Sequence, residues 1–238
     1  VLACLLHDAS ECYMSDVPRP LKQEMPRYRE IEDHLLSVIY EKYLGSDLTA
    51  EEQRMMKQID ELPRLKLGVF PTPFYKLEGI SARYGRNIWI KRDDLCGVAL
   101  GGNKVRKLEF VLAEALDQGC DTVFTTGGAQ SNHAALTAAC AARLGMKCIL
   151  LLKRRGVTEH RGNLVLDELF GAEVRLLDMD SYDEIYAEMH RIGGTLEQAG
   201  HKCCYIPVGA STALGAVGYV SGAREIAVQA MAAGVRLG

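Results

Sequence analysis

The sequence lacks several features that mark particular classes of protein. It has no excess of basic charge, because 28 Lys and Arg stand against 31 Asp and Glu, for a net charge of −3. These residues are scattered, so no basic surface for nucleic acid is predicted. No apolar run approaches the roughly 20 residues of a membrane span. We therefore expect neither nucleic acid nor a membrane as a partner.

The first residues of the sequence are not expected to form a signal peptide. Residues 1–6 are apolar, but they are too few for a signal-peptide core and no basic residue precedes them. The chain begins with Val1 rather than Met, which predicts that its upstream end is missing.

The cysteines lack the spacing of a metal site or of a disulfide framework. No Cys-x-x-Cys pair occurs, and most cysteines lie in apolar stretches, where a free thiol behaves as a small hydrophobe. We therefore expect free thiols and a reducing, cytoplasmic setting. The eight residues are Cys4, Cys12, Cys96, Cys120, Cys140, Cys148, Cys203 and Cys204.

The character of the sequence changes near residue 60, with no repeat and no low-complexity segment on either side. Before the change, periodic patterns predict helices over 1–13, about 26–44 and 49–61. After it, strands and helices alternate. We therefore divide the chain into an all-α unit, residues 1–61, and an α/β unit, residues 62–238.

The α/β unit is predicted to contain βαβ units and a largely parallel sheet. Apolar runs predict buried strands at 87–91, 121–126, 147–152, 173–177 and 203–208. Periodic segments predict helices at 104–118, 131–144, 160–170, 181–199 and 215–233. Ligands of such sheets bind beyond the carboxyl ends of the strands, at helix N-termini.

Lys104 follows Gly101-Gly102-Asn103 and opens a predicted helix, where the backbone can approach a ligand closely. A lysine that forms a Schiff base must reach its neutral form, and desolvation or a neighbouring cation lowers its pKa. Arg106 and Lys107 can supply that cation. Lys107 lies one helical turn from Lys104, where it could meet a phosphate. The alternative is an ordinary solvated start of a basic helix.

Ser131-Asn132-His133 begins the next predicted helix, directly after a strand. The N–H groups of its first turn can face an anion such as an amino-acid carboxylate. Asn132 can hydrogen-bond a ring hydroxyl, and Ser131 is small enough to lie against a reacting carbon. Ordinary capping by Ser131 and a half-exposed position for His133 are the alternatives. Together with Lys104, this segment is typical of a pyridoxal-phosphate (PLP) site.

Further motifs occur in order after residue 62: Pro63-Arg64-Leu65, Pro71-Thr72-Pro73, Ile90-Lys91-Arg92-Asp93-Asp94, Gly101 to Glu109, Gln130 to His133, Ile206-Pro207-Val208-Gly209 and Ser211 to Tyr219. With these motifs, residues 63–238 resemble the D-cysteine desulfhydrase and 1-aminocyclopropane-1-carboxylate deaminase family. The resemblance implies an α/β, fold-type-II PLP-dependent (tryptophan synthase β-like) fold, with parallel sheets, helices on both faces and a homodimeric assembly.

The same resemblance implies roles for individual residues. Lys104 is the catalytic Schiff-base lysine, and Lys107 contacts the cofactor phosphate. Asn132 meets the cofactor ring oxygen. Ser131 acts on the substrate, and Ser131, Asn132 and His133 form the substrate site.

The implied reaction is β-elimination from a small amino acid, which gives pyruvate, ammonia and sulfide. A 1-aminocyclopropane-1-carboxylate deaminase and a cysteate sulfo-lyase are alternatives on the same scaffold. His133 favours the desulfhydrase, because the deaminases compared carry Gln there. Ala135 departs from the Arg that is common in both branches and bears on carboxylate handling. The family's second phosphate loop is expected beyond residue 238, so we expect residues 1–238 alone to bind PLP weakly and to show little or no turnover.

The N-terminal segment places His7 beside Asp8 on a predicted helix, with Glu11 one turn further on. His and Asp can ligate a divalent metal, with Glu as an acid–base partner, although this pair alone occurs often. Together with the patterns at 16–22, 28–32 and 51–60, the segment resembles the middle of an HD-domain 5′-deoxynucleotidase-type phosphohydrolase.

The HD resemblance implies a divalent-metal site with His7, Asp8 and Asp60 as ligands and with Glu11 and Asp16 as catalytic groups. Three hypotheses therefore stand. The first is a PLP-dependent lyase carried by residues 63–238, and the second is a metal-dependent nucleotide phosphohydrolase carried by residues 1–61. The third is an inactive fusion fragment or binding module.

Overall fold

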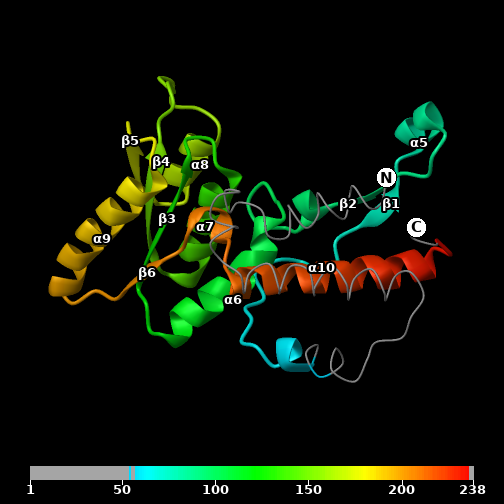
Figure 1. Cartoon of the computed structure of the whole chain (residues 1–238), viewed down its shortest axis with the longest axis horizontal. Coiled ribbons are helices and arrows are strands. Elements are labelled where there is room, and N and C mark those ends of the chain that lie inside the picture. Colours follow the sequence, from blue (N-terminus) through cyan, green and yellow to red (C-terminus); the bar gives the residue numbers. More distant parts are fainter. Residues whose placement is uncertain (1–53, 55–56, 236–238) are drawn as a thin grey trace.

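A four-stranded parallel sheet forms the centre of the part of the chain that this computed structural model describes, residue 54 and residues 57–235 (Figure 1). Its strands lie in the order β5-β4-β3-β6, and every neighbouring pair is parallel. Their boundaries lie within three residues of the predicted ones. The strands are β3 (Thr122–Gly128), β4 (Lys147–Lys153), β5 (Glu173–Leu177) and β6 (Cys203–Tyr205).

Helices cover both faces of this sheet, as the sequence predicts. Side chains of α6, α7 and α8 share the larger hydrophobic core on one face, whereas α9 packs on the other face (Figure 1). The α/β prediction with helices on both faces is therefore confirmed for the described residues. These helices are α6 (Lys104–Asp117), α7 (Asn132–Leu144), α8 (Asn163–Leu169) and α9 (Tyr182–Gln198).

The central strand β4 shows how the two layers arise. Successive side chains of a strand point to opposite faces. Cys148, Leu150 and Leu152 belong to the larger core, and Ile149 and Leu151 belong to the cluster under α9. All five are buried. This is why the strand reads as a continuous apolar run in the sequence.

The helix α10 (Ala213–Ala232) packs across α6 (Figure 1). A short 3-10 turn, η2 (Val208–Ala210), leads into it from β6. The two helices approach so closely at Gly218 that a Cβ there would lie 2.1 Å from the Arg106 carbonyl oxygen. The crossing therefore requires glycine at this position.

The apolar run at 87–91 does not join the parallel sheet, which corrects the prediction for that segment. Instead, β2 (Trp89–Lys91) pairs antiparallel with β1 (Phe74–Lys76) in a separate two-stranded sheet. The helix α5 (Glu78–Tyr84) connects the two strands, and neither it nor β1 was predicted. β2 is only half-buried.

One disulfide corrects the expectation that all cysteines are free. Cys120, just before β3, is bonded to Cys204 on the neighbouring strand β6. The two residues are 84 positions apart in sequence, so their spacing carries no signal. Cys96, Cys140, Cys148 and Cys203 are free, and the first three are buried. Within the described residues, no helix has both the length and the apolar character that a membrane crossing needs.

Candidate functional site

The N-termini of α6 and α7 meet across a pair of glycines. Gly101 and Gly102 have φ values of 76° and 142°, which residues with a side chain rarely adopt. A Cβ on Gly101 would lie 1.7 Å from the Asp94 carbonyl oxygen, and one on Gly102 would lie 2.5 Å from Asn132 Nδ2. Gly101 therefore lets the turn before Lys104 lie against the backbone at Asp94, and Gly102 lets it lie against the start of α7.

Lys104 and Asn132 lie on the two sides of this junction. Lys104 is half-buried, and Asn132 is exposed. The Asn132 side chain donates to the Gly101 carbonyl from Nδ2, over 3.4 Å. The structure thus brings the lysine turn and the predicted ring-oxygen ligand together at the carboxyl edge of the sheet.

Ser131 is the N-cap of α7. Its Oγ accepts a hydrogen bond from the Ala134 N–H at 3.2 Å. A Cβ on Gly127 would lie 2.6 Å from this oxygen, so the glycine at the end of β3 makes room for the cap. The capping alternative is therefore confirmed, and an action of Ser131 on a substrate stays a prediction.

His133 is buried, so the half-exposed position considered for it is wrong. Its Nε2 lies 2.8 Å from Thr125 Oγ1, and that hydroxyl donates its proton to the Ile206 carbonyl at 2.9 Å. Because the hydroxyl proton is used, the imidazole must donate from Nε2, and its Nδ1 is left as a buried acceptor without a hydrogen-bond partner.

His133 is also neutral. Burial lowers its pKa to about 3, and the nearby charges of Lys104 and Lys107 act in the same direction. The three predicted residues Ser131, Asn132 and His133 lie together at the start of α7. The single N–H of the neutral ring is committed to Thr125, so contact of His133 with a substrate stays a prediction.

Lys107 lies one turn along α6 and is buried. Its ammonium donates to the Gly209 carbonyl at 3.1 Å and to Ser211 Oγ at 3.3 Å. It also lies 5.5 Å from the centroid of the Tyr219 ring. Lys107 thus ties α6 to the loop before α10, and its predicted contact with a phosphate stays a prediction.

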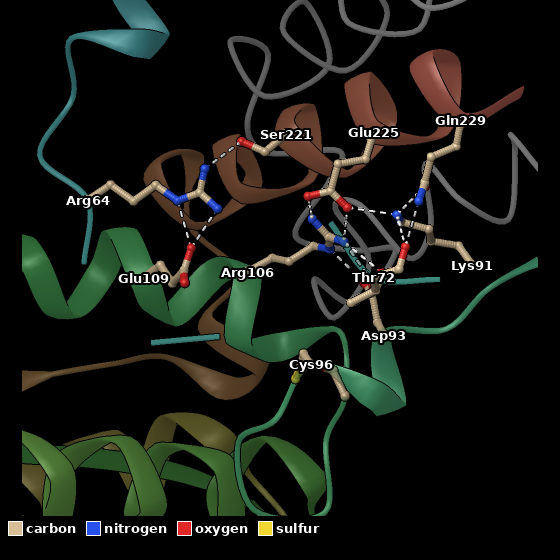
Figure 2. A network of polar contacts seen from close by, with 11 residues as sticks. Arg64, Thr72, Lys91, Asp93, Cys96, Arg106, Glu109, Ser221, Glu225 and Gln229 are labelled. Carbon is tan, nitrogen blue, oxygen red and sulfur yellow. Dashed lines mark hydrogen bonds and ion pairs between the residues drawn. The ribbon is translucent and has the colours of Figure 1, made fainter. Parts of the chain in front are cut away.

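A buried ion-pair network is centred on Arg106, two residues after Lys104 in the sequence (Figure 2). Arg106 is 1% exposed. Its guanidinium donates to both carboxylate oxygens of Asp93, from Nε at 2.7 Å and from Nη2 at 2.8 Å. On its other side it donates to both carboxylate oxygens of Glu225, at 3.0 and 2.8 Å. The network therefore joins α6, α10 and the turn η1 (Asp93–Leu95).

Lys91 extends this network from β2. Its ammonium lies 2.7 Å from a Glu225 oxygen and donates to the Thr72 carbonyl at 2.7 Å and to Gln229 Oε1 at 2.6 Å (Figure 2). Burial acts to raise the pKa of Glu225, but hydrogen bonds from Arg106 and Lys91 leave that pKa below its ordinary value. The C-terminal half of α10 is thus connected to the part of the chain that precedes Lys104.

A second ion pair lies further along α6. Arg64 donates to Glu109 Oε2 at 2.6 Å, and the other Glu109 oxygen accepts the backbone N–H groups of Leu67 and Gly68, each at 3.0 Å. Arg64 also donates to Ser221 Oγ of α10 at 3.1 Å (Figure 2). Most residues of the two ion-pair groups lie in or near the motifs that carry the family resemblance. From the sequence, only Arg106 could be given a role, as a cation near Lys104.

The described residues do not contain the whole predicted metal site. Asp60 is exposed and pairs with Arg224 of α10. His7, Asp8, Glu11 and Asp16 lie outside the described residues. Among residue 54 and residues 57–235, no three His, Cys, Asp or Glu side chains gather in a way that could hold a metal ion. The metal site therefore stays a prediction.

Comparisons with known proteins identify close relatives of this chain. Residues 65–235 match a family described as pyridoxal-phosphate dependent enzyme. A D-cysteine desulfhydrase of Salmonella paratyphi B is 43% identical over 179 residues, which cover 73% of this chain and 54% of the relative. A Pyrococcus abyssi protein, provisionally named a 1-aminocyclopropane-1-carboxylate deaminase, is 40% identical and covers 75% of this chain and 54% of the relative.

Solved structures of pyridoxal-phosphate dependent enzymes and their homologues resemble this chain as well. An ACC deaminase homologue superimposes with a TM-score of 0.69 and 39% identity, over 74% of this chain and 53% of that one. A diaminopropionate ammonia lyase of Escherichia coli, solved with an aminoacrylate-PLP azomethine, has a TM-score of 0.57 and 18% identity, over 82% of this chain and 53% of that one. The latter shows the fold alone. The chain thus spans about half the length of the relatives it matches. The resemblance predicted for residues 63–238 and the fold-type-II fold are confirmed, whereas the HD-domain resemblance stays a prediction.

The residues at the junction fit a phosphorylated aldehyde. A half-buried lysine opens α6, a second lysine lies one turn further on, and an amide side chain stands across the junction. Gly102 leaves open a space that a Cβ would fill, against Asn132 Nδ2. Positive charge, close backbone approach and an exposed amide donor are the features that such a ligand needs.

Proposed function

Because the chain belongs to the family of pyridoxal-phosphate dependent enzymes, we propose that it carries the cofactor lysine and part of the substrate site of a D-cysteine desulfhydrase-type lyase. The proposed reaction is β-elimination from a small amino acid. The observation that carries the proposal is the convergence of Lys104, Asn132 and two helix N-termini across Gly101-Gly102. A 1-aminocyclopropane-1-carboxylate deaminase or a cysteate sulfo-lyase is the alternative on the same scaffold.

Each residue of the junction has a proposed task. Lys104 would hold the aldehyde of PLP until the substrate amine displaces it, and the released lysine amine would then accept the proton from the substrate α-carbon. Asn132 donates to the ring oxygen, and the first N–H groups of α7 bind the substrate carboxylate at the positive end of the helix dipole. Lys107 contacts the phosphate. When bound, PLP supplies the electron sink that the elimination requires.

Assembly and location belong to the same proposal. The family resemblance implies a homodimer, and the positions of the cysteines in apolar stretches predict a cytoplasmic setting. The free thiols of Cys96, Cys140 and Cys148 support a reducing environment. The disulfide between Cys120 and Cys204 argues against it, because a reducing environment would convert that bond to two thiols.

Spectral titration tests the proposed function. PLP added to the 238-residue chain is expected to give a visible absorption band that Lys104→Ala abolishes and that Lys66→Ala, at an exposed lysine, leaves unchanged. D-cysteine is then expected to shift the band, because its amine replaces the lysine amine on the cofactor, whereas little or no pyruvate and sulfide is expected from residues 1–238 alone. A band that responds to none of D-cysteine, 1-aminocyclopropane-1-carboxylate and cysteate would overturn the assignment, because each alternative requires its own substrate to react with the bound cofactor.

A further inference from the structure

Asp93 holds the turn that carries Lys104 at two points. Its backbone carbonyl accepts the Gly102 N–H at 3.0 Å, just before Lys104. Its carboxylate accepts two hydrogen bonds from Arg106, just after Lys104. One residue of η1 therefore fixes the chain on both sides of the lysine. We call Asp93 and Arg106 the lysine clasp.

The clasp is itself rigidly supported. Thr72 Oγ1 donates to Asp93 Oδ1 at 2.8 Å and accepts from Arg106 Nη2 at 3.3 Å. The Arg106 guanidinium carbon lies 4.3 Å from the centroid of the Phe70 ring. Glu225 pairs with the far side of the guanidinium. A planar guanidinium with two carboxylates and an aromatic face has one favourable orientation, so the clasp has little freedom to move.

The Arg106 guanidinium of the clasp stays protonated although it is buried. Burial alone would lower the pKa of Arg106, but the hydrogen bonds and charges of Asp93 and Glu225 raise it above its ordinary value. A buried charge that lost one partner would carry a large desolvation penalty. The pair therefore resists any shift of η1 relative to α6, which is the shift that would displace Lys104.

We propose that Asp93 and Arg106 are positioning residues for Lys104: the clasp sets where the lysine amine stands relative to Asn132 and the cofactor. This inference rests on the proposed function, because it assigns a purpose to the position of the amine. A purely stabilising ion pair is the competing interpretation. The two interpretations differ in what happens locally at Gly101 to Lys104 when the pair is broken.

The Arg64–Glu109 pair offers a matched control in the same molecule. It is also buried on its glutamate side, it joins the same helix α6, and it also reaches α10. Its hydrogen bonds run between Arg64, Glu109 and the partners Leu67, Gly68 and Ser221, all of which lie outside the segment 93–104. Loss of this pair should therefore destabilise the fold without moving Lys104.

The experiment compares Asp93→Asn and Arg106→Lys with Arg64→Lys in the full chain. Asp93→Asn is expected to speed amide hydrogen exchange in the segment 98–104 and to weaken apparent PLP affinity, measured by the visible band, on the order of tenfold. The lysine amine is displaced rather than removed, so this expected loss of affinity is smaller than the roughly 100-fold loss of rate that misplacement of a reacting group by about 1 Å can cause. Arg106→Lys is expected to weaken PLP affinity as well, because an ammonium lacks the planar fork that pairs with both oxygens of Asp93 and of Glu225.

Arg64→Lys is expected to lower the melting temperature and to leave both local exchange and PLP affinity within about twofold of wild type. If Asp93→Asn and Arg64→Lys change exchange in 98–104 equally, the clasp is only stabilising and the inference is overturned. If Asp93→Asn does not fold, Thr72→Val replaces it, because it removes one hydrogen bond to Asp93 and keeps the charges. It must then shift exchange in the same direction, and no shift would also overturn the inference.

The two proposals fail in different ways. If wild-type chain gives no PLP band, the proposed function fails, and exchange in the apo chain still decides whether Asp93 and Arg106 hold the turn. If the band forms but is insensitive to Asp93→Asn, the function stands and the clasp is rejected.

Discussion

At the scale of single residues, burial sets the charge of the groups around the junction. His133 is neutral because it is buried beside two lysines, whereas Arg106 keeps its charge because two carboxylates surround it. Asp167 on α8 is buried without such partners. Each of these groups links a protonation state to the stability of the fold.

Asp167 is predicted to make the fold less stable as the pH rises. It is buried, neither carboxylate oxygen has a hydrogen-bond partner in the structure, and burial together with Glu168 raises its pKa to about 7. The folded state therefore holds a proton that the unfolded state has lost, and stability falls between about pH 4 and 7, by about 4 kcal/mol at most.

Asp167→Asn should remove this fall. Denaturant unfolding at about pH 4.5 and 8 is expected to show the variant more stable than wild type at the higher pH, with the difference shrinking at the lower one. Glu184→Gln, at an exposed carboxylate of α9, is the control and should show no such trend. Equal pH dependence of Asp167→Asn and wild type would contradict the assignment.

His133 is predicted to act in the opposite direction. Its pKa is lowered to about 3 in the folded protein, against an ordinary value of 6.5. The unfolded state therefore takes up a proton that the folded state rejects, so stability is lost as the pH falls through about 6.5 toward 3, by about 3 kcal/mol near pH 4.5.

The same unfolding measurement at about pH 7 and 4.5 tests His133→Gln. The variant should lose less stability on acidification than wild type, and His201→Gln, at an exposed histidine, should behave as wild type. The pH ranges in which His133 and Asp167 affect stability overlap, and their effects on stability are opposite. Each variant is therefore compared with wild type at the same pH. A fall in stability as steep as that of wild type would exclude a buried neutral His133.

At the scale of elements, the crossing of α6 and α10 positions the site. α6 begins at Lys104, and α10 supplies Glu225 to the Arg106 guanidinium. Gly218 allows the backbones to approach, because a Cβ there would meet the Arg106 carbonyl oxygen. The motif from Ser211 to Tyr219 therefore has a structural meaning, close helix packing, that the sequence alone did not reveal.

Gly218→Ala is predicted to destabilise the fold and disturb the clasp. The added Cβ would lie 2.1 Å from backbone atoms that cannot move independently, and overpacking of this kind costs about 1–3 kcal/mol. Gly194→Ala is the matched control, because its Cβ would meet nothing within 4 Å and alanine favours a helix by about 1 kcal/mol. Melting temperatures should therefore move in opposite directions, and a stabilised Gly218→Ala would contradict the described crossing.

The elements were predictable to different degrees for physical reasons. Strands such as β4 and helices such as α9 are long and strongly patterned, so the sequence locates them. β1 was missed because it has only three residues, with Tyr75 exposed between two half-buried neighbours. β2 was assigned to the wrong sheet because an apolar run does not specify which strand it pairs with.

At the scale of the whole molecule, distant segments meet in one polar network. Arg106 contacts Asp93 across 13 residues and Glu225 across 119. Ion pairs between such distant residues produce no periodic pattern in the sequence. The sequence therefore identified the motifs but could not predict which of their residues contact one another. The junction at Lys104 was predictable, because paired glycines before a lysine indicate close backbone approach at a helix start. The burial of His133 was not, because it depends on Thr125 and on Ile206 beyond β6.

The central claim is that Lys104 is the residue that binds PLP. Reduction with borohydride at saturating PLP, followed by proteolysis and mass mapping, measures this directly, with Lys104→Ala as the control for labelling of surface lysines. We expect one dominant pyridoxyl adduct, on the peptide that contains Lys104, and its loss in the variant. An adduct that falls on Lys107 instead, or that is spread evenly over exposed lysines in both proteins, would contradict the account.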